Sequence, residues 1–333
     1  MRSFVAPILF VVGQVLAPQN AWAVKIVIVT DQPKAVKAQE VASLFRSTEP
    51  FSRLKNLDFK VIKTSSAKLG CNLAPPTALD VAGVKNSDLL ETIESRDRLA
   101  TSLNLKKRSA RFLLPASCND QGSQPPSRLI ACDSIQSLLF LGALKKTEKA
   151  AFVIVVKDDP RYGGSGGPSP VITSGSPAAM ALHELLHQLG FADEYSYLNA
   201  CEADLYCPPG GDDTISRSGF GSHPTTAFNV AVFSEDKSYS SSEDVRRKHN
   251  KQIHWVNFID KTTELLTNGK VGTPRPGLIG IYRAGVCDKA SSLTPTWASV
   301  SEPTIMRTLK TTYIPEDYWP TIAKSLNTKI EGQ

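Results

Sequence analysis

The hydrophobic pattern of the chain opens, after the first 23 residues, with a β-branched apolar run at Val24–Thr30, which is typical of a buried strand. Apolar residues then recur at helical spacing across residues 33–46, and residues 59–62 predict a second strand. A strand, a helix and another strand in succession favour an α/β layer. We therefore expect a fold of the α/β (α+β) class that begins with a sheet.

The same patterns predict further elements along the chain. Residues 114–129 are rich in Pro, Ser, Gly and Asn and predict a loop. Residues 161–168 predict a flexible glycine turn, which lacks the spacing of phosphate-binding loops. The remaining predicted elements are strands at 151–156 and 170–174 and helices at 79–105, 178–189, 244–266 and 315–330.

The first 23 residues have the three parts of a secretory signal. Met1 and Arg2 are followed by an apolar stretch at residues 4–16, which is short for a membrane span, and by the small-x-small site Ala21-Trp22-Ala23. The alternative is a buried N-terminal helix. We expect cleavage before Val24, a secreted or periplasmic location and no stable membrane anchor, because no later segment is apolar enough to span a bilayer.

Composition narrows the classes of partner. Of the 333 residues, 41% are hydrophobic and 21% are charged, which is an ordinary globular balance. The net charge is +6, but the basic residues are dispersed and no aromatic-basic motif accompanies them, so we expect no nucleic-acid binding.

Six cysteines follow the predicted signal, and an even count in an exported chain suggests disulfides. Short sequence separations favour Cys118–Cys132 and Cys201–Cys207, which would leave Cys71–Cys287 as a long-range tie. Six cysteines allow fifteen pairings, so this connectivity is an expectation from spacing alone. No CxxC pair is present, which argues against a zinc ribbon.

The predicted helix at 178–189 carries the candidate chemistry. Ser176 can cap its first turn, Pro177 suits the first helical position, and Gly190 can end it in a left-handed conformation. His183 and His187 are four residues apart, so both imidazoles share one helix face and can reach one ion. Glu184 can then take a proton from a metal-activated water and pass it to a leaving amine.

A catalytic zinc ion needs a third protein ligand, and Asp193 is the natural one. Gly190 lets the chain reverse, so that the Asp193 carboxylate can return toward the ion. The alternative roles for Asp193 are a helix cap or an ion-pair partner. The rival ligands are Glu194, His223, His249 and His254. The five-residue HExxH pattern also occurs by chance in helices, and the Gly and Asp at fixed offsets make chance less credible here.

Three segments resemble metzincin peptidases and, within that clan, the IgA-peptidase-like metallopeptidases. They are the strand and glycine turn at residues 154–167, the zinc motif from His183 to Tyr195, and a C-terminal part with Ile281-Tyr282-Arg283 and the Met-turn Ile305-Met306-Arg307. The resemblance covers residues 151–308. Met306 would lie beneath the metal as a structural residue, although a lone Met is usually core packing.

The resemblance implies an upper subdomain (24–190) with a twisted sheet and the active helix, and an irregular lower subdomain (191–333) with the Met-turn. It also implies one Zn²⁺ per chain, hydrolysis of a protein or peptide substrate, and strand addition of that substrate at an edge near residues 170–174. Arg307 and Tyr313 are candidate transition-state stabilisers. We expect a monomer. Two alternatives remain, a zinc amidase acting on cell-wall peptides and a non-catalytic zinc-binding adhesion module.

Overall fold

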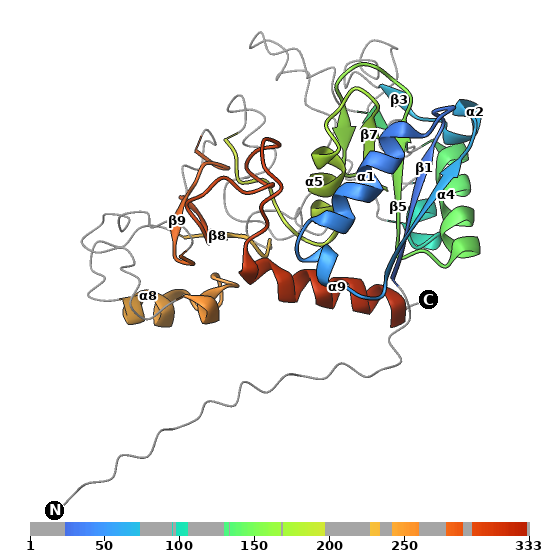
Figure 1. Ribbon diagram of the computed structural model, residues 1–333. Helices are drawn as coiled ribbons and strands as arrows, with labels where there is room; N and C mark the ends of the chain where they lie inside the picture. Colours follow the sequence, from blue (N-terminus) through green and yellow to red (C-terminus); the bar gives the residue numbers. More distant parts are fainter. Residues whose placement is uncertain are drawn as a thin grey trace, which may run out of the picture.

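The computed structural model describes residues 24–73, 95, 98–105, 130–132, 134–167, 169–196, 227–233, 242–259, 278–288 and 295–331 (Figure 1). The predicted signal, the predicted loop at 114–129 and most of the predicted helix at 79–105 lie outside these ranges, although residues 98–102 are helical. His223, Cys118, Cys201 and Cys207 also lie outside them.

A five-stranded sheet with the order β2-β1-β5-β7-β6 forms the centre of the fold. Its first four strands run parallel and β6 is antiparallel to β7, so the predicted α/β class is confirmed. The predicted strands at 24–30, 59–62, 151–156 and 170–174 are all present in it. Their bounds are β1 Val24–Thr30, β2 Leu57–Lys63, β5 Phe152–Lys157, β6 Gly164–Ser165 and β7 Val171–Thr173.

Helices cover both faces of this sheet because its strands are apolar on both sides (Figure 1). On one face Ile26 and Ile28 pack in a core with α1 (Val36–Ser47), α5 (Ala179–Gln188) and α9 (Trp319–Glu331). On the other face Val27 and Val29 pack with α2 (Ser66–Leu69) and α4 (Ile135–Glu148). The helix α9 comes from the far end of the chain, so the last residues of the sequence complete the first core.

A smaller antiparallel sheet, with the order β8-β10-β9, lies in the C-terminal part. Its strands are Val230–Val232, Thr296–Ala298 and Tyr282–Ala284. Among the described residues, the predicted helix at 244–266 is wrong after His249, because α8 spans Ser242–His249 and a short 3₁₀ turn follows at Val256–Phe258, whereas residues 260–266 lie outside the described ranges. The chain turns there because Ile253 and Trp255 are buried in a core with Trp297.

The glycine segment after β5 differs from the prediction. Two of its residues, Gly164 and Ser165, form the edge strand β6, and residues 163–167 are all buried. The strand β7 therefore lies inside the sheet, and the expected edge at 170–174 is wrong. The turn that precedes β6 lies close to the end of β7 because Gly175 packs against the backbone of Pro160, where a Cβ would have no room.

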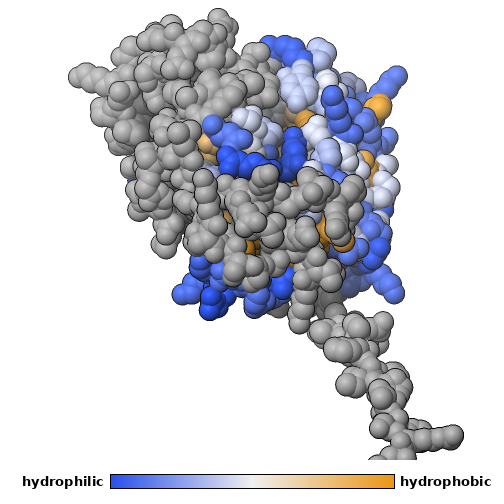
Figure 2. All heavy atoms as spheres, turned by 90° about the vertical axis from the view of Figure 1, so that its left-hand side faces the viewer, coloured by the Kyte–Doolittle hydropathy of each residue, from blue (hydrophilic) through white to orange (hydrophobic). Residues whose placement is uncertain are grey.

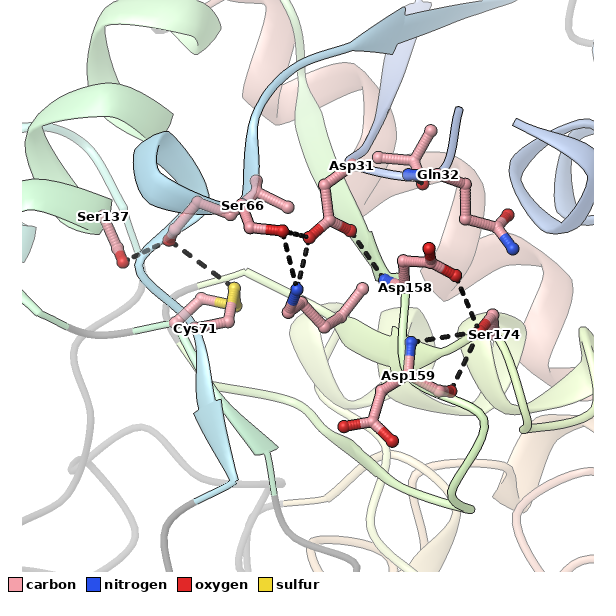
Figure 3. A network of polar contacts seen from close by, with 12 residues as sticks. Asp31, Gln32, Ser66, Cys71, Ser137, Asp158, Asp159 and Ser174 are labelled. Atoms are coloured by element: carbon pink, nitrogen blue, oxygen red, sulfur yellow. Dashed lines mark hydrogen bonds and ion pairs between the residues drawn. A yellow bond between two sulfur atoms is a disulfide. The ribbon is translucent and has the colours of Figure 1, made fainter. Parts of the chain in front are cut away.

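A polar network closes the carboxyl ends of β1 and β5 (Figure 3). The buried Asp31 carboxylate accepts hydrogen bonds from the Asp158 amide (2.6 Å) and the Ser66 hydroxyl (2.5 Å), and it pairs with Lys157. Ser174 bridges the next turn by donating to the Asp159 carbonyl (2.9 Å). Both Asp31 oxygens accept hydrogen bonds within the fold, so this network fixes the turn that leads into β6.

The disulfide connectivity differs from the expected one. Cys71 is bonded to Cys132, which excludes both Cys118–Cys132 and Cys71–Cys287. The cause is the short antiparallel pair β3 (Asn72–Leu73) and β4 (Ile130–Ala131), in which Asn72 faces Ala131 and the next residues outward are the two cysteines. Cys287 is disulfide-bonded too. Sequence separation failed here because strand pairing, not chain proximity, brings the thiols together.

Candidate metal centre

The helix α5 holds the candidate residues and ends where the sequence predicts. Gly190 has a φ of 101°, a conformation that glycine favours, and the Phe191 amide donates to the Leu186 carbonyl (3.1 Å). The predicted cap at Ser176 is wrong. Its hydroxyl donates to the Gly163 carbonyl instead (2.7 Å), so it ties the hairpin of β6 to the start of the helix.

Three buried side chains converge at this helix end, and they are His183, His187 and Asp193. The two Nε2 atoms are 3.0 Å apart. Asp193 Oδ1 lies 3.1 Å from His183 Nε2 and 3.4 Å from His187 Nε2. The group could hold a metal ion, and it brings together the three ligands that the sequence predicts.

The other ring nitrogens fix how both imidazoles are presented. Nδ1 of His183 lies 3.0 Å from the Ile305 carbonyl, and Nδ1 of His187 lies 2.9 Å from the Phe191 carbonyl. A carbonyl can only accept, so each Nδ1 carries the proton and donates it. The Nε2 lone pairs are then directed at the centre of the group, which is the arrangement of metal-binding histidines.

Lone pairs this close require positive charge between them. Burial opposes protonation of His183, but the carboxylates of Asp193 and Glu184 outweigh it and raise the pKa of His183 to about 9. Burial would likewise raise the pKa of Asp193, yet the two imidazoles hold it well below its usual range. The surroundings of the group thus favour positive charge between the three side chains, which a metal cation would supply.

Glu184 lies next to this group and is partly exposed. Its carboxylate lies against the glycine segment, where a methyl group added to Gly166 would be 3.4 Å from Glu184 Oε2. The carboxylate is thus beside the three ligands without being one of them.

Glu194 is a rival ligand in the sequence but has a structural role. Its carboxylate accepts hydrogen bonds from Asn229 (2.8 Å), from Thr304 (2.8 Å) and from the Tyr318 hydroxyl. Its amide donates to the Met306 carbonyl (3.0 Å). These bonds turn the Glu194 side chain away from the histidines and tie the segment that carries Asp193 to the Met306 turn.

Met306 and Ile305 are fully buried in the core that also contains α5. Because the Ile305 carbonyl holds His183 and the Met306 carbonyl holds Glu194, this turn supports the group from below. Sequence reasoning missed Asn229, Thr304 and Tyr318. No local pattern marks them, since their contacts with Glu194 cross 35 to 124 residues.

The other candidates lie elsewhere. His249 stacks on Phe233 with ring centroids 4.0 Å apart, and His254 meets the Phe228 ring edge-on at 5.7 Å, so neither joins the group. Arg307 donates to the Ser301 carbonyl (3.0 Å) and pairs with the Glu194 carboxylate at 3.6 Å, so it belongs to the contacts around Glu194. Tyr313 lines an open cavity of about 390 Å³ that none of the three ligands lines. The Tyr195 ring lies nearly parallel to the His183 ring, with the two ring centroids 6.4 Å apart.

A buried acid near this support predicts an unusual pH dependence. Both Asp317 carboxylate oxygens lack hydrogen-bond partners among the described residues. Burial raises the pKa of Asp317 to about 7, and the Glu194 charge adds to the rise. The folded pKa exceeds the unfolded one, so stability falls as pH rises between about 4 and 7. Asp317→Asn should remove this fall and stabilise the protein at pH 8 by at most about 4 kcal/mol.

Urea unfolding at pH 5 and pH 8 checks this expectation. The exposed neighbour offers a matched control, because Glu316→Gln removes a similar carboxylate from solvent rather than from the core. An Asp317→Asn protein whose stability follows the same pH curve as the wild type would show that Asp317 does not titrate in this way.

No protein-family model and no curated protein matches the sequence. The function of the site is therefore inferred from its own geometry. No helix among the described residues is long and apolar enough to cross a membrane. Figure 2 shows that the described surface on one side of the molecule is mainly hydrophilic, with small apolar areas between.

Proposed function

We propose that the protein is a zinc-dependent endopeptidase in which His183, His187 and Asp193 hold one Zn²⁺ and Glu184 is the general base. The observation that carries this proposal is the 3.0–3.4 Å spacing of the three converging atoms. Two ligand atoms that each lie about 2.0 Å from a tetrahedral zinc ion are about 3.3 Å apart. Two imidazoles and one carboxylate are also a donor set that zinc accepts, with one position left for substrate or water.

The residues around the proposed zinc ion have separate roles. The Ile305 and Phe191 carbonyls hold the two imidazoles in the tautomer that presents Nε2. A bound zinc ion would supply Lewis-acid activation of water and of the scissile carbonyl. Glu184 accepts the proton of the attacking water and delivers it to the leaving amine nitrogen, so no nucleophilic side chain is needed.

A metzincin type of active site is supported by the parts that surround the ligands. The active helix packs on a mixed sheet, the chain reverses at Gly190, and a buried methionine turn lies beneath the group. The antiparallel strand next to this helix is β6, so β6 takes the place proposed for substrate alignment. Its burial means that a substrate would pair with it only after the covering residues move.

Export is part of the same proposal. The signal-like N-terminus of the sequence and the Cys71–Cys132 disulfide both suit an oxidising compartment, which is the periplasm or the medium. A protein or peptide substrate in that compartment fits a site that carries out hydrolysis without a diffusible cofactor.

Metal analysis combined with a cleavage assay tests the proposal. We expect about one zinc per purified chain, cleavage of fluorescently labelled casein, loss of cleavage with a chelator and recovery when zinc is added. Peptidoglycan digested in parallel separates the alternatives. Release of peptidoglycan fragments with intact casein would indicate an amidase, and zinc binding without cleavage of either substrate would indicate a binding module.

A further inference from the structure

Gln188, the last residue of α5, forms a contact that the proposed chemistry does not use. Its side-chain nitrogen donates to the Gly166 carbonyl (2.5 Å) and to the Gly167 carbonyl (2.6 Å). Only the amide nitrogen can donate to two carbonyl oxygens, so the orientation of this amide is fixed. Both of its protons are used on consecutive residues of one strand end.

The strand end that Gln188 binds lies directly against the proposed base. A methyl group at position 166 would be 3.4 Å from Glu184 Oε2 and 3.6 Å from His187 Cβ. At position 164 a Cβ would be 2.3 Å from the Met180 sulfur, so the Met180 side chain would have to shift. Glycine at position 164 therefore lets the backbone lie close to Met180 of α5, and at position 166 the backbone lies beside Glu184 and His187.

Other hydrogen bonds hold the residues that come just before the two residues that Gln188 binds. The Gly163 amide donates to the Ser176 hydroxyl (2.8 Å), and the Ser165 hydroxyl donates to the Ile130 carbonyl (2.5 Å). Gln188 acts at the next two residues, 166 and 167. Without its bonds, the part of the segment nearest to Glu184 would lose the side chain that connects it to the active helix.

We propose that Gln188 is a positioning residue that holds residues 166 and 167, at the end of β6, at a fixed distance from Glu184. Because the two carbonyls are held by the same helix that carries the base, the strand end and the carboxylate keep one relative position. Substrate aligned on β6 would then present its scissile bond to Glu184 in a fixed geometry. The catalytic part of this inference rests on the proposed peptidase function, whereas the contact itself does not.

Two variants test the inference in the full mature protein. Gln188→Ala removes both hydrogen bonds, and the isosteric Gln188→Glu places a carboxylate against two carbonyl oxygens. With labelled casein as substrate, we expect kcat to fall about tenfold to a hundredfold in both variants. Zinc content should stay at the wild-type value. In hydrogen–deuterium exchange, the amides of residues 163–167 should exchange faster in both variants.

Gln136→Ala is the matched control, because Gln136 also donates its amide to a backbone carbonyl, that of Ala67, at 2.8 Å. It should change neither casein cleavage nor exchange at residues 163–167. Unchanged kcat and exchange in Gln188→Ala would overturn the inference, and so would faster cleavage, which would make Gln188 a gate. If the wild type cleaves nothing, the proposed function fails while the exchange result still decides whether Gln188 holds the strand.

Discussion

Glu184→Gln should abolish the cleavage of labelled casein while leaving zinc bound. Glutamine has the shape of the native side chain but cannot accept a proton from water at neutral pH. Removal of a general base lowers a rate by about 10²- to 10⁴-fold. Zinc should remain because the converging group consists of His183, His187 and Asp193, and Glu184 lies beside it. Initial cleavage rates and zinc content measured on one preparation check both statements.

A second glutamate on another helix provides the control. Glu40 lies on α1 with a half-exposed side chain that pairs with Lys37, so Glu40→Gln should leave both cleavage and zinc content unchanged. Cleavage at the wild-type rate by a zinc-loaded Glu184→Gln protein would falsify the proposed role of Glu184. Loss of zinc together with cleavage would instead make Glu184 part of the metal site.

The candidate site could be predicted from the sequence because its parts are local. The two histidines are four positions apart, one helix face carries both, and Gly190 reverses the chain three residues before Asp193. Each of these relations depends on backbone geometry within about three turns of chain. The structure accordingly brings together the three ligands at the positions that spacing predicts.

The sequence predicts an element of the fold where its apolar residues form a clear pattern, and it fails to predict an element where they do not. The helix α4 escaped prediction because its apolar side chains lie on both sides of it. Leu138 and Leu141 are buried, whereas Ile135 and Leu139 are about half exposed, so no single apolar stripe marks the helix. Buried strands such as β1 and β5, with continuous β-branched runs, had no such ambiguity.

Contacts between distant segments account for the other differences. The order of strands puts β6 rather than β7 at the edge of the sheet, and the pairing of β3 with β4 selects Cys132 as the partner of Cys71. The support around Glu194 likewise depends on Thr304 and Tyr318, more than 100 residues away. Such pairings are decided by packing of the whole chain, which local periodicity does not encode.

Asp193→Asn should weaken zinc binding by about a hundredfold to a thousandfold. The apparent free energy of zinc binding in four-ligand sites is about 10–16 kcal/mol, or about 2.5–4 kcal/mol for each ligand. Asparagine keeps the shape of Asp193 but removes the negative charge that faces both imidazoles at 3.1 and 3.4 Å. A neutral amide oxygen would then balance little of the charge of a divalent cation. Competition with a chromophoric zinc chelator at constant pH measures the affinity.

The expected loss of zinc affinity should come from removal of the Asp193 carboxylate as a ligand and not from the change in the net charge of the protein. Asp58 is exposed on β2, so Asp58→Asn changes the net charge equally and should leave zinc affinity at the wild-type value. Glu194 cannot replace the lost ligand, because Asn229 and Thr304 already hold its carboxylate on the far side of the segment. Unchanged zinc affinity in Asp193→Asn would therefore exclude Asp193 as the third ligand and require one from outside the three converging side chains.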